Sequence, residues 1–462
     1  MAELIIHRGT HQIGGCCTEL SVNGNRILID FGASLPGSEG SAPLSDQKLA
    51  EKVFDGRPAA AVLFTHYHGD HYGLFKRIPK DVPLYIGGIA KEILSVLVPY
   101  IDIDSEEKGM PRVKEMHPYR LKEWLELEHA PGIRILPLYV DHSALDSYMF
   151  YIEAAGKRIL FTGDFRNHGI VGEKDRAWRT LRAYVPRNID LLITEGTMLS
   201  RISTVRKGPW LDDKGDEHIP VRTEAELGAQ ARKLFLRSKY NFVLVSSTNL
   251  DSIMEFYHNT PPELPFVCDL YQARVILNAM QGMEHRGSFP MYYTPRHHPV
   301  LRVLGEESEK WDYWRKVGRR LRYPLKLQPV TEEELEQSGF VLLARKNSHP
   351  KDYTSPFEEL RDTYFDRDGQ IIYSMWDGYL EPEHADEALL NYIGNRKVVR
   401  LHTSGHTYVE TIAKLIETVQ PKRIIPMHTE RAEEFSSIPE FAPWADRVKV
   451  LTDGKPLNLD EL

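Results

Sequence analysis

The chain has 462 residues, of which 58 are Lys or Arg and 66 are Asp or Glu, so its formal net charge is −8. The length predicts two to four domains at about 100–200 residues each, and the composition, 42% hydrophobic and 27% charged, excludes disordered and fibrous classes. The negative balance excludes a general polycation that coats nucleic acid, so any chemistry on phosphates has to be local.

The cysteines and the apolar runs indicate the compartment. Cys16, Cys17 and Cys268 cannot supply a disulfide framework, which favours a reducing compartment. Residues 1–8 contain an early acid and no signal-peptide run, and the best candidate for a membrane span, 86–101, is interrupted by charges. We expect a cytoplasmic protein with no membrane contact.

The first 200 residues read as short strands that each end on a polar residue. Residues 21–30 predict a hairpin, and 60–65, 158–164 and 189–195 predict apolar strands. Open α/β sheets bind ligands where their strands end. The polar residues at these ends are Asp30, His66, Asp164 and Glu195.

The pattern changes at about residue 201 to alternating helices and strands. A capping box at 223–226 opens a helix, and it is followed by strand 241–246, helix 250–257, strand 265–268 and helix 270–280. After residue 390 the earlier pattern returns, with strand 398–401, helix 409–419 and strand 423–426. We therefore predict three segments, 1–200, 201–390 and 391–462, with a doubly wound α/β domain in the middle.

The strongest motif is His66-Tyr67-His68-Gly69-Asp70-His71, directly after a buried strand. Its imidazoles and carboxylate are ligands suited to Zn²⁺, Mn²⁺ or Fe²⁺. His66 and His68 can point to one ion, while Asp70 and His71 can face a second. Four residues cannot close two sites, so further ligands are expected at other strand ends.

Three residues are placed to complete these sites. His142, Asp164 and His428 each follow an apolar strand, and Asp164 could bridge both ions as a carboxylate. A lone histidine is more often a hydrogen-bonded structural residue. The density of the motif at 66–71 is what favours metal binding for the set.

In order, these motifs resemble those of the metallo-β-lactamase superfamily. The resemblance implies an αββα sandwich in which one ion is bound by His66, His68 and His142, the other by Asp70, His71 and His428, with Asp164 bridging. It also implies that Asp30 orients the metal-binding loop from behind the ligands. The alternative for Asp30 is a turn-forming residue before Gly32.

The separation of 264 positions between Asp164 and His428 indicates an inserted domain. This resembles the β-CASP group of nucleases, which includes ribonuclease J and mRNA 3′-end processing endonucleases. Glu195, the element Ser404-Gly405-His406 and the motif at 426–430 match that group. The chain ends about thirty residues after His428, so we expect no counterpart of the C-terminal domain of ribonuclease J, and a homo-oligomer is left open.

The resemblance implies in-line attack of a metal-bound hydroxide on phosphorus. His406 is then the candidate general acid, Glu195 the partner that raises its pKa, and Ser404 a contact to the scissile phosphate. The alternative for Ser404 and His406 is an N-cap of the helix that follows.

Two further segments have open roles. The turn Ser247-Thr248-Asn249 could cradle a phosphate of the substrate, and plain N-capping explains it equally well. Residues 311–326 mix basic and aromatic side chains, which suits single-stranded nucleic acid, although a solvated helix face is the more common origin of such a pattern.

Together these features predict a hydrolase of single-stranded RNA that uses two divalent ions, Zn²⁺ first and Mn²⁺ as the alternative. DNA, or a small ester, lactone or thioester, is the alternative substrate. A scaffold protein with a vestigial site is the non-enzymatic alternative, and the complete ligand set argues against it.

Overall fold

The computed structural model describes residues 2–35, 44–101, 106–172, 176–204, 208–285, 300–305, 309–346 and 356–461. It divides into two compact units, one formed by Met1–Val205 with Gly405–Leu462 and the other by Arg206–Ser404. We call them the first and the second unit.

The first unit contains a seven-stranded and a six-stranded sheet. The seven-stranded sheet has the order β22 (Pro456–Asn458), β1 (Ala2–Arg8), β2 (Cys17–Val22), β3 (Asn25–Ile29), β4 (Ala61–Leu63), β5 (Leu84–Ile86), β6 (His117–Pro118). The six-stranded sheet has the order β21 (Arg423–Met427), β11 (Leu191–Glu195), β10 (Lys157–Phe161), β9 (Ser147–Ala154), β8 (Ile133–Val140), β7 (Leu125–Glu126).

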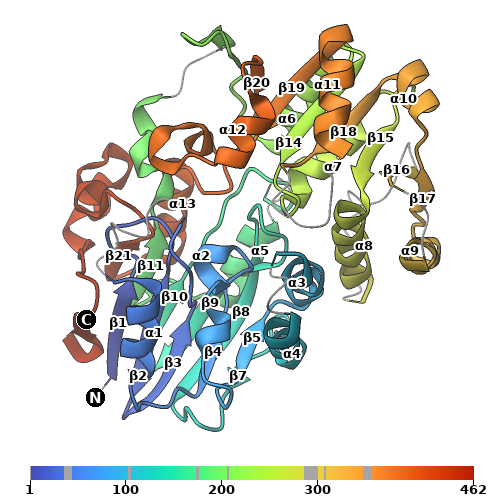
Figure 1. The fold of residues 1–462 in the computed structure, drawn as a ribbon. Helices are drawn as coiled ribbons and strands as arrows, with labels where there is room; N and C mark the ends of the chain where they lie inside the picture. Colours follow the sequence, from blue (N-terminus) through green and yellow to red (C-terminus); the bar gives the residue numbers. More distant parts are fainter. Residues whose placement is uncertain are drawn as a thin grey trace. The chain divides into compact units, whose positions relative to one another are not determined.

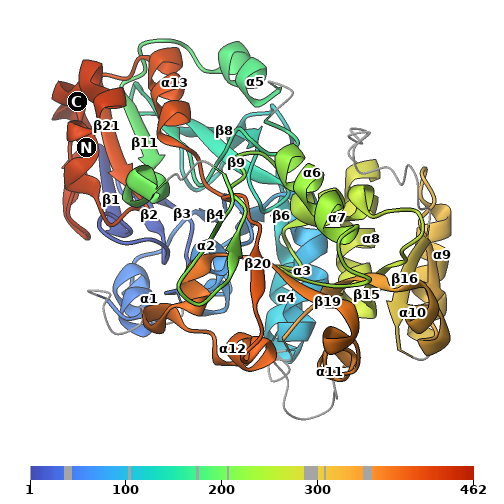
Figure 2. The same cartoon turned by 90° about the horizontal axis from the view of Figure 1, so that it is seen from above.

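The two sheets of the first unit pack face to face between layers of helices. Side chains from both sheets, such as Ile29 and Phe150, share one buried core. A second core lies between the six-stranded sheet and α5 (Arg176–Tyr184) and α13 (Val409–Val419), and it includes Trp178 and Leu415. Helices α1 (Asp46–Phe54), α2 (Gly69–Tyr72), α3 (Gly88–Ile101) and α4 (Glu106–Glu115) lie against the seven-stranded sheet (Figure 1). Figure 2 shows the resulting αββα layers.

The second unit is built on a nine-stranded sheet. Its order is β12 (Trp210–Leu211), β13 (Glu217–His218), β20 (Val398–Arg400), β19 (Gly369–Ser374), β14 (Tyr240–Val245), β18 (Phe340–Ala344), β15 (Phe266–Asp269), β16 (Val300–Leu304), β17 (Lys326–Pro329). Each pair of neighbouring strands is parallel, except the pair β12 and β13, which is antiparallel.

Helices cover both faces of this sheet, as parallel strands require. One face is covered by α6 (Glu224–Phe235), α7 (Leu250–Asn259) and α8 (Leu270–His285), and the other by α10 (Glu332–Ser338), α11 (Pro356–Asp368) and α12 (Glu387–Ile393) (Figure 2). Thr223 caps α6 by accepting a hydrogen bond from the Glu226 amide at 3.1 Å, which confirms the predicted helix start.

The predicted fold class, an αββα sandwich with an inserted α/β domain, is confirmed. One expectation about the chain is wrong: residues 398–401 do not return to the first domain. Strand β20 pairs with β19 in the sheet of the second unit, so the second unit extends to Ser404 rather than to residue 390. Short apolar strands look alike in sequence, and only their pairing partners distinguish the two sheets. Among the described residues, no helix has the length and apolar character needed to cross a membrane.

Candidate metal centre and active site

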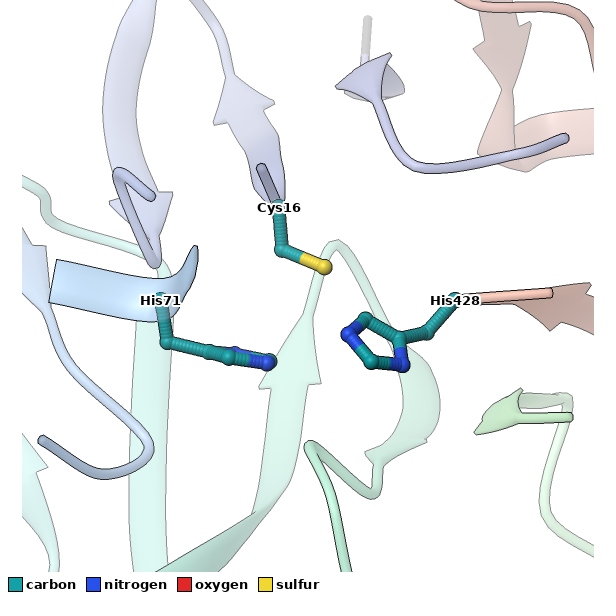
Figure 3. A group of neighbouring side chains, drawn as sticks. All are labelled: Cys16, His71 and His428. Atoms are coloured by element: carbon teal, nitrogen blue, oxygen red, sulfur yellow. The ribbon is translucent and has the colours of Figure 1, made fainter. Parts of the chain in front are cut away.

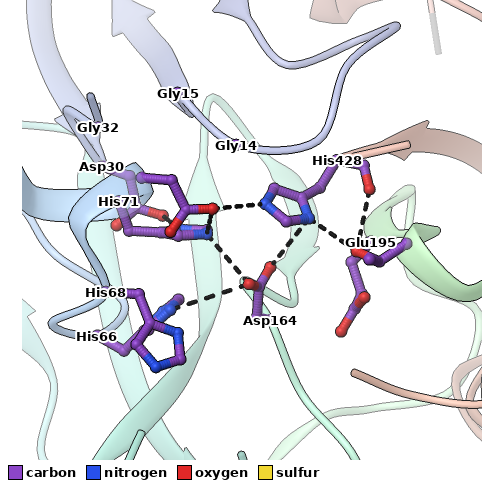
Figure 4. Close-up of polar contacts among 12 residues, drawn as sticks. Gly14, Gly15, Asp30, Gly32, His66, His68, His71, Asp164, Glu195 and His428 are labelled. Atoms are coloured by element: carbon purple, nitrogen blue, oxygen red, sulfur yellow. Dashed lines mark hydrogen bonds and ion pairs between the residues drawn. The ribbon is translucent and has the colours of Figure 1, made fainter. Parts of the chain in front are cut away.

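The polar residues of the site come from the carboxyl ends of strands in both sheets of the first unit. Strands β3 and β4 are parallel, and so are β10, β11 and β21, so their ends meet at one edge of the sandwich. The last residues of these strands and the loops after them carry Asp30, the segment 66–71, Asp164, Glu195 and His428. Figure 4 shows the side chains of His66, His71 and His428 arranged around Asp164.

The first ligand group contains His66, His68 and His142. Their nearest ring nitrogens lie within 4.8 Å of one another, and His142 Nε2 is 3.1 Å from His68 Nδ1. His142 Nδ1 donates to the carbonyl oxygen of Gly405 at 2.6 Å, which fixes the ring and leaves Nε2 facing the other two. Three converging imidazoles are a ligand set for a metal ion.

The second group contains Asp70, His71 and His428, with Asp164 beside it. His428 Nε2 lies 3.2 Å from Asp70 Oδ2, and His71 Nε2 lies 3.1 Å from Asp164 Oδ2. The same Asp164 oxygen is 3.9 Å from His66 Nε2, so this carboxylate lies between the two groups.

Asp30 and Thr65 form a buried support under this group. His71 Nδ1 donates to Asp30 Oδ2 at 2.8 Å, and both the amide and the hydroxyl of Thr65 donate to the same carboxylate. A ring held through Nδ1 presents Nε2 to a ligand, and such outer hydrogen bonds set the orientation of metal-binding histidines. Asp30 therefore holds the ring of His71, and it is more than a turn residue.

His428 is held in a similar way from the opposite side. Its Nδ1 lies 2.8 Å from the hydroxyl of Thr197, and that hydroxyl donates to the His428 carbonyl at 3.1 Å. The hydroxyl oxygen can then accept a hydrogen bond from Nδ1–H, which leaves Nε2 facing Asp70.

Burial keeps the first group neutral at pH 7. It lowers the pKa values of His66 and His142 well below the usual value, and it lowers that of His68 to about 4. Neutral imidazole is the form that binds metal ions. For His71, burial acts in the same direction, but the nearby carboxylates of Asp164 and Asp30 outweigh it and raise the pKa. These carboxylates favour a positive charge at this position, whether a proton or a cation carries it.

The atoms at the centre fit a metal ion. His66 Nε2, His71 Nε2 and Asp164 Oδ1 are buried and have no hydrogen-bond partner among the described residues. Unpartnered buried polar atoms are costly, and coordination to a cation would satisfy all three. The site therefore has the donor set and the geometry for metal binding.

Glu195 and His406 form a pair beside this centre. His406 Nδ1 donates to Glu195 Oε2 at 3.0 Å, and the other carboxylate oxygen accepts from the Phe165 amide at 2.9 Å. Burial alone would lower the pKa of His406, but Glu195 and Asp164 outweigh it and raise the pKa. The His406 side chain is 22% exposed, whereas Glu195 is 1% exposed, so the imidazole is the member of the pair that can reach a substrate.

The N-cap explanation for Ser404 and His406 is wrong. Helix α13 begins at Val409, and its N-cap is Tyr408, whose side chain makes no capping hydrogen bond. The explanation does hold for Asn249, whose side chain accepts from the Ser252 amide at the start of α7. The predicted phosphate contacts Ser404, Ser247, Thr248 and Asn249 belong to the second unit and stay predictions.

The basic aromatic stretch is largely a helix, α9 (Glu309–Arg320). Trp311 is buried, whereas Tyr313, Lys316, Arg319 and Arg320 are exposed. This is a solvated helix face, and a contact to nucleic acid there stays untested.

Sequence reasoning missed Thr65, Thr197 and Gly405. The two threonines lie next to predicted site residues, so their position in the motifs was the available signal. Gly405 accepts the hydrogen bond of His142 through its backbone carbonyl, and the residue type gives no sign of such a contact.

Comparison with known proteins agrees with this geometry. Residues 17–204 match the metallo-beta-lactamase superfamily, and residues 395–436 match the Zn-dependent metallo-hydrolase RNA specificity domain. Over 99% of both chains, the structure is similar, with a TM-score of 0.67 and 19% identity, to a protein of unknown function from Enterococcus faecalis V583. That similarity supports the fold.

Three curated relatives are similar in sequence. An RNase J-like protein of Methanocaldococcus jannaschii is 28% identical over 43% of this chain and 43% of its own length. Endoribonuclease ysh1 of Schizosaccharomyces pombe is 24% identical over 40% of this chain and 25% of its own. Ribonuclease J of Helicobacter pylori is 20% identical over 91% of this chain and 55% of its own.

This chain therefore spans about a quarter to just over half of the length of these curated relatives. The two matched segments leave residues 205–394 between them, which hold most of the second unit. On its matched segments, its αββα sandwich and its converging histidines, the chain belongs to the metallo-β-lactamase superfamily, in the β-CASP arrangement with an inserted α/β unit.

Proposed function

We propose that this protein is a metal-dependent phosphodiesterase that hydrolyses single-stranded RNA. The converging ligand groups support a hydrolytic metal centre. The match to an RNA specificity domain and the similarity to proteins named as ribonucleases support RNA as the substrate. We further propose two divalent ions, Zn²⁺ first and Mn²⁺ as the alternative, and a cytoplasmic location.

Each ion has its own ligands in this proposal. The first is held by His66, His68 and His142, the second by Asp70, His71 and His428, and Asp164 is shared. Such ions, when bound, activate water as a nucleophile and neutralise charge on phosphoryl oxygens. Asp30 and Thr65 act by holding the ring of His71, so they position a ligand and do not touch substrate.

The observation that carries the proposal is the pair of His406 and Glu195, which supplies a general acid beside the metal centre. Cleaving a phosphodiester expels an alkoxide, which leaves far more easily if it receives a proton. His406 is half-buried, holds its proton through Glu195, and lies 3.6 Å from the shared Asp164. In this proposal His406 protonates the leaving oxygen while the attacked phosphorus lies at the metal centre.

The remaining contacts are proposed from residue type and position. Ser404 immediately precedes Gly405, whose carbonyl holds His142, and its hydroxyl would donate to the scissile phosphate. Ser247, Thr248 and Asn249 follow the carboxyl end of β14, where amides and hydroxyls suit a phosphate of the substrate.

The experiment is a substrate panel with metal-loaded protein. It uses end-labelled RNA and DNA of one sequence, each with and without a 5′-phosphate, beside small ester, lactone and thioester substrates. We expect cleavage of RNA that chelation abolishes, and the product lengths distinguish exonucleolytic from endonucleolytic cleavage. Turnover of a small ester without cleavage of RNA would overturn the proposal, and preference for DNA would correct its substrate.

A further inference from the structure

A cysteine that belongs to neither ligand group, Cys16, lies beside the metal centre. The sulfur of Cys16, one ring nitrogen of His71 and one of His428 lie within 4.8 Å of one another, and Cys16 is 1% exposed. Figure 3 shows the thiol directed toward the two rings. Separations of this size leave room for one ion between the three side chains.

The backbone that positions Asp70 also positions this sulfur. The Cys16 amide donates to the Asp70 carbonyl at 2.9 Å, and the Gly32 amide donates to the Cys16 carbonyl at 2.9 Å. Just before Cys16, a Cβ on Gly14 would lie 3.1 Å from Asp70 Oδ2 and 2.8 Å from Leu35, so the turn approaches the site closely because it carries no side chain there. Backbone hydrogen bonds thus hold Cys16 beside the second ligand group.

A second observation points to a ligand at this place. The buried Nε2 of His71 makes no hydrogen bond within the described chain, although Asp164 Oδ2 lies 3.1 Å away, and Asp30 engages the other ring nitrogen. His71 Nε2 is thus available to bind a metal ion. Thiolate sulfur and imidazole nitrogen are the pair of ligands that Zn²⁺ prefers in proteins, whereas Mn²⁺ prefers oxygen.

We propose that Cys16 supplies a sulfur ligand to the ion held by His71 and His428. The inference rests on the proposed metal centre and adds a ligand that neither ligand group contains. On binding, the sulfur forms a bond to the metal, and the thiol proton leaves to solvent. The sulfur biases this position toward Zn²⁺ over Mn²⁺.

The test replaces the ions by Co²⁺, because a thiolate bound to Co²⁺ gives an intense near-ultraviolet charge-transfer absorption that nitrogen and oxygen ligands do not give. The protein has three cysteines. We therefore compare the parent, Cys16→Ser, and a double variant, Cys17→Ser with Cys268→Ser, in which Cys16 is the remaining thiol. Bound Co²⁺ is counted by elemental analysis in each.

The expected result is the absorption in the parent and in the double variant, and its loss in Cys16→Ser. If Cys16→Ser does not fold, the double variant and a zinc–sulfur distance of about 2.3 Å by X-ray absorption in the parent still decide. If the parent protein binds Co²⁺ but does not show the absorption, this inference alone is overturned. Cys16 is then a small apolar residue of the core. Failure to bind Co²⁺ at all would overturn the proposed metal centre as well.

Discussion

The imidazole of His406 donates from Nδ1 to the Glu195 carboxylate at 3.0 Å, across 211 positions of sequence. The contact joins the carboxyl end of β11 to the segment before α13. Glu195 is held in place by the Phe165 amide, so the pair is fixed from one side and partly open on the other. This relationship gives the first prediction.

Glu195→Gln removes the negative charge that helps to keep His406 protonated. The His406 pKa is raised in the parent, so its acid form persists to higher pH, and the rate falls as pH rises through that pKa. In Glu195→Gln the pKa falls, and the alkaline limb of the kcat profile moves to lower pH. The measurement is kcat against pH on labelled RNA.

The control for this prediction is Glu123→Gln, an exposed carboxylate that pairs with Arg120. It should leave the profile unchanged. An alkaline limb at the same pH in Glu195→Gln and the parent would show that His406 is not the group that titrates there.

Asp30→Asn weakens metal binding without removing a ligand. The neutral amide accepts the hydrogen bond from His71 Nδ1 less strongly than the carboxylate does. The orientation of the ring is therefore held less firmly. Loss of such an outer partner costs about 10- to 100-fold in metal affinity. Competition with a chelator measures it, and the exposed Asp55→Asn serves as the control. Equal Zn²⁺ affinity in Asp30→Asn and the parent would remove Asp30 from the support of the site.

Gly405→Ala should disturb His142 through the backbone. A Cβ at Gly405 would lie 2.5 Å from Ser143 Oγ, closer than atoms can pack, so the carbonyl that accepts from His142 must shift. We expect weaker metal binding, measured by chelator competition. Adding Ser143→Ala removes that hydroxyl and should recover much of the affinity. Absence of any recovery in the double variant would mean that the contact with Ser143 is not the cause.

Much of this site was predictable because residue types that bind metal ions stand at the ends of apolar strands in the sequence. His66, His68, Asp70, His71 and Asp164 follow recognisable apolar strands, and the parallel pairing of those strands brings them together. Sequence could not show what supports them. The acceptor for His142 is a carbonyl 263 positions away, and β20 resembles a strand of the first unit although it pairs within the second.

The metal-free protein should lose stability on acidification. Burial lowers the pKa values of His66, His68 and His142, so these rings bind fewer protons in the folded state than in the unfolded state, where the pKa is about 6.5. Their contribution is therefore full above about pH 6.5 and falls as pH drops below it. The urea midpoint of chelated protein, measured from about pH 7.5 to about pH 5, tests this.

His142→Asn removes one of these proton-binding sites and should flatten the dependence, whereas His117→Asn, at an exposed position on β6, should not. The same slope in His142→Asn and the parent would contradict the assignment of a depressed pKa to that ring.

We propose that the metal centre and His406 together cleave RNA. The direct measurement is the single-turnover rate on end-labelled single-stranded RNA for metal-loaded parent, Asp70→Ala and His406→Ala proteins, each with its metal content determined. We predict that the parent cleaves, that Asp70→Ala loses metal and activity together, and that His406→Ala keeps its metal but is slower by about 100- to 10,000-fold. Rates equal to the parent in both variants would contradict the claim.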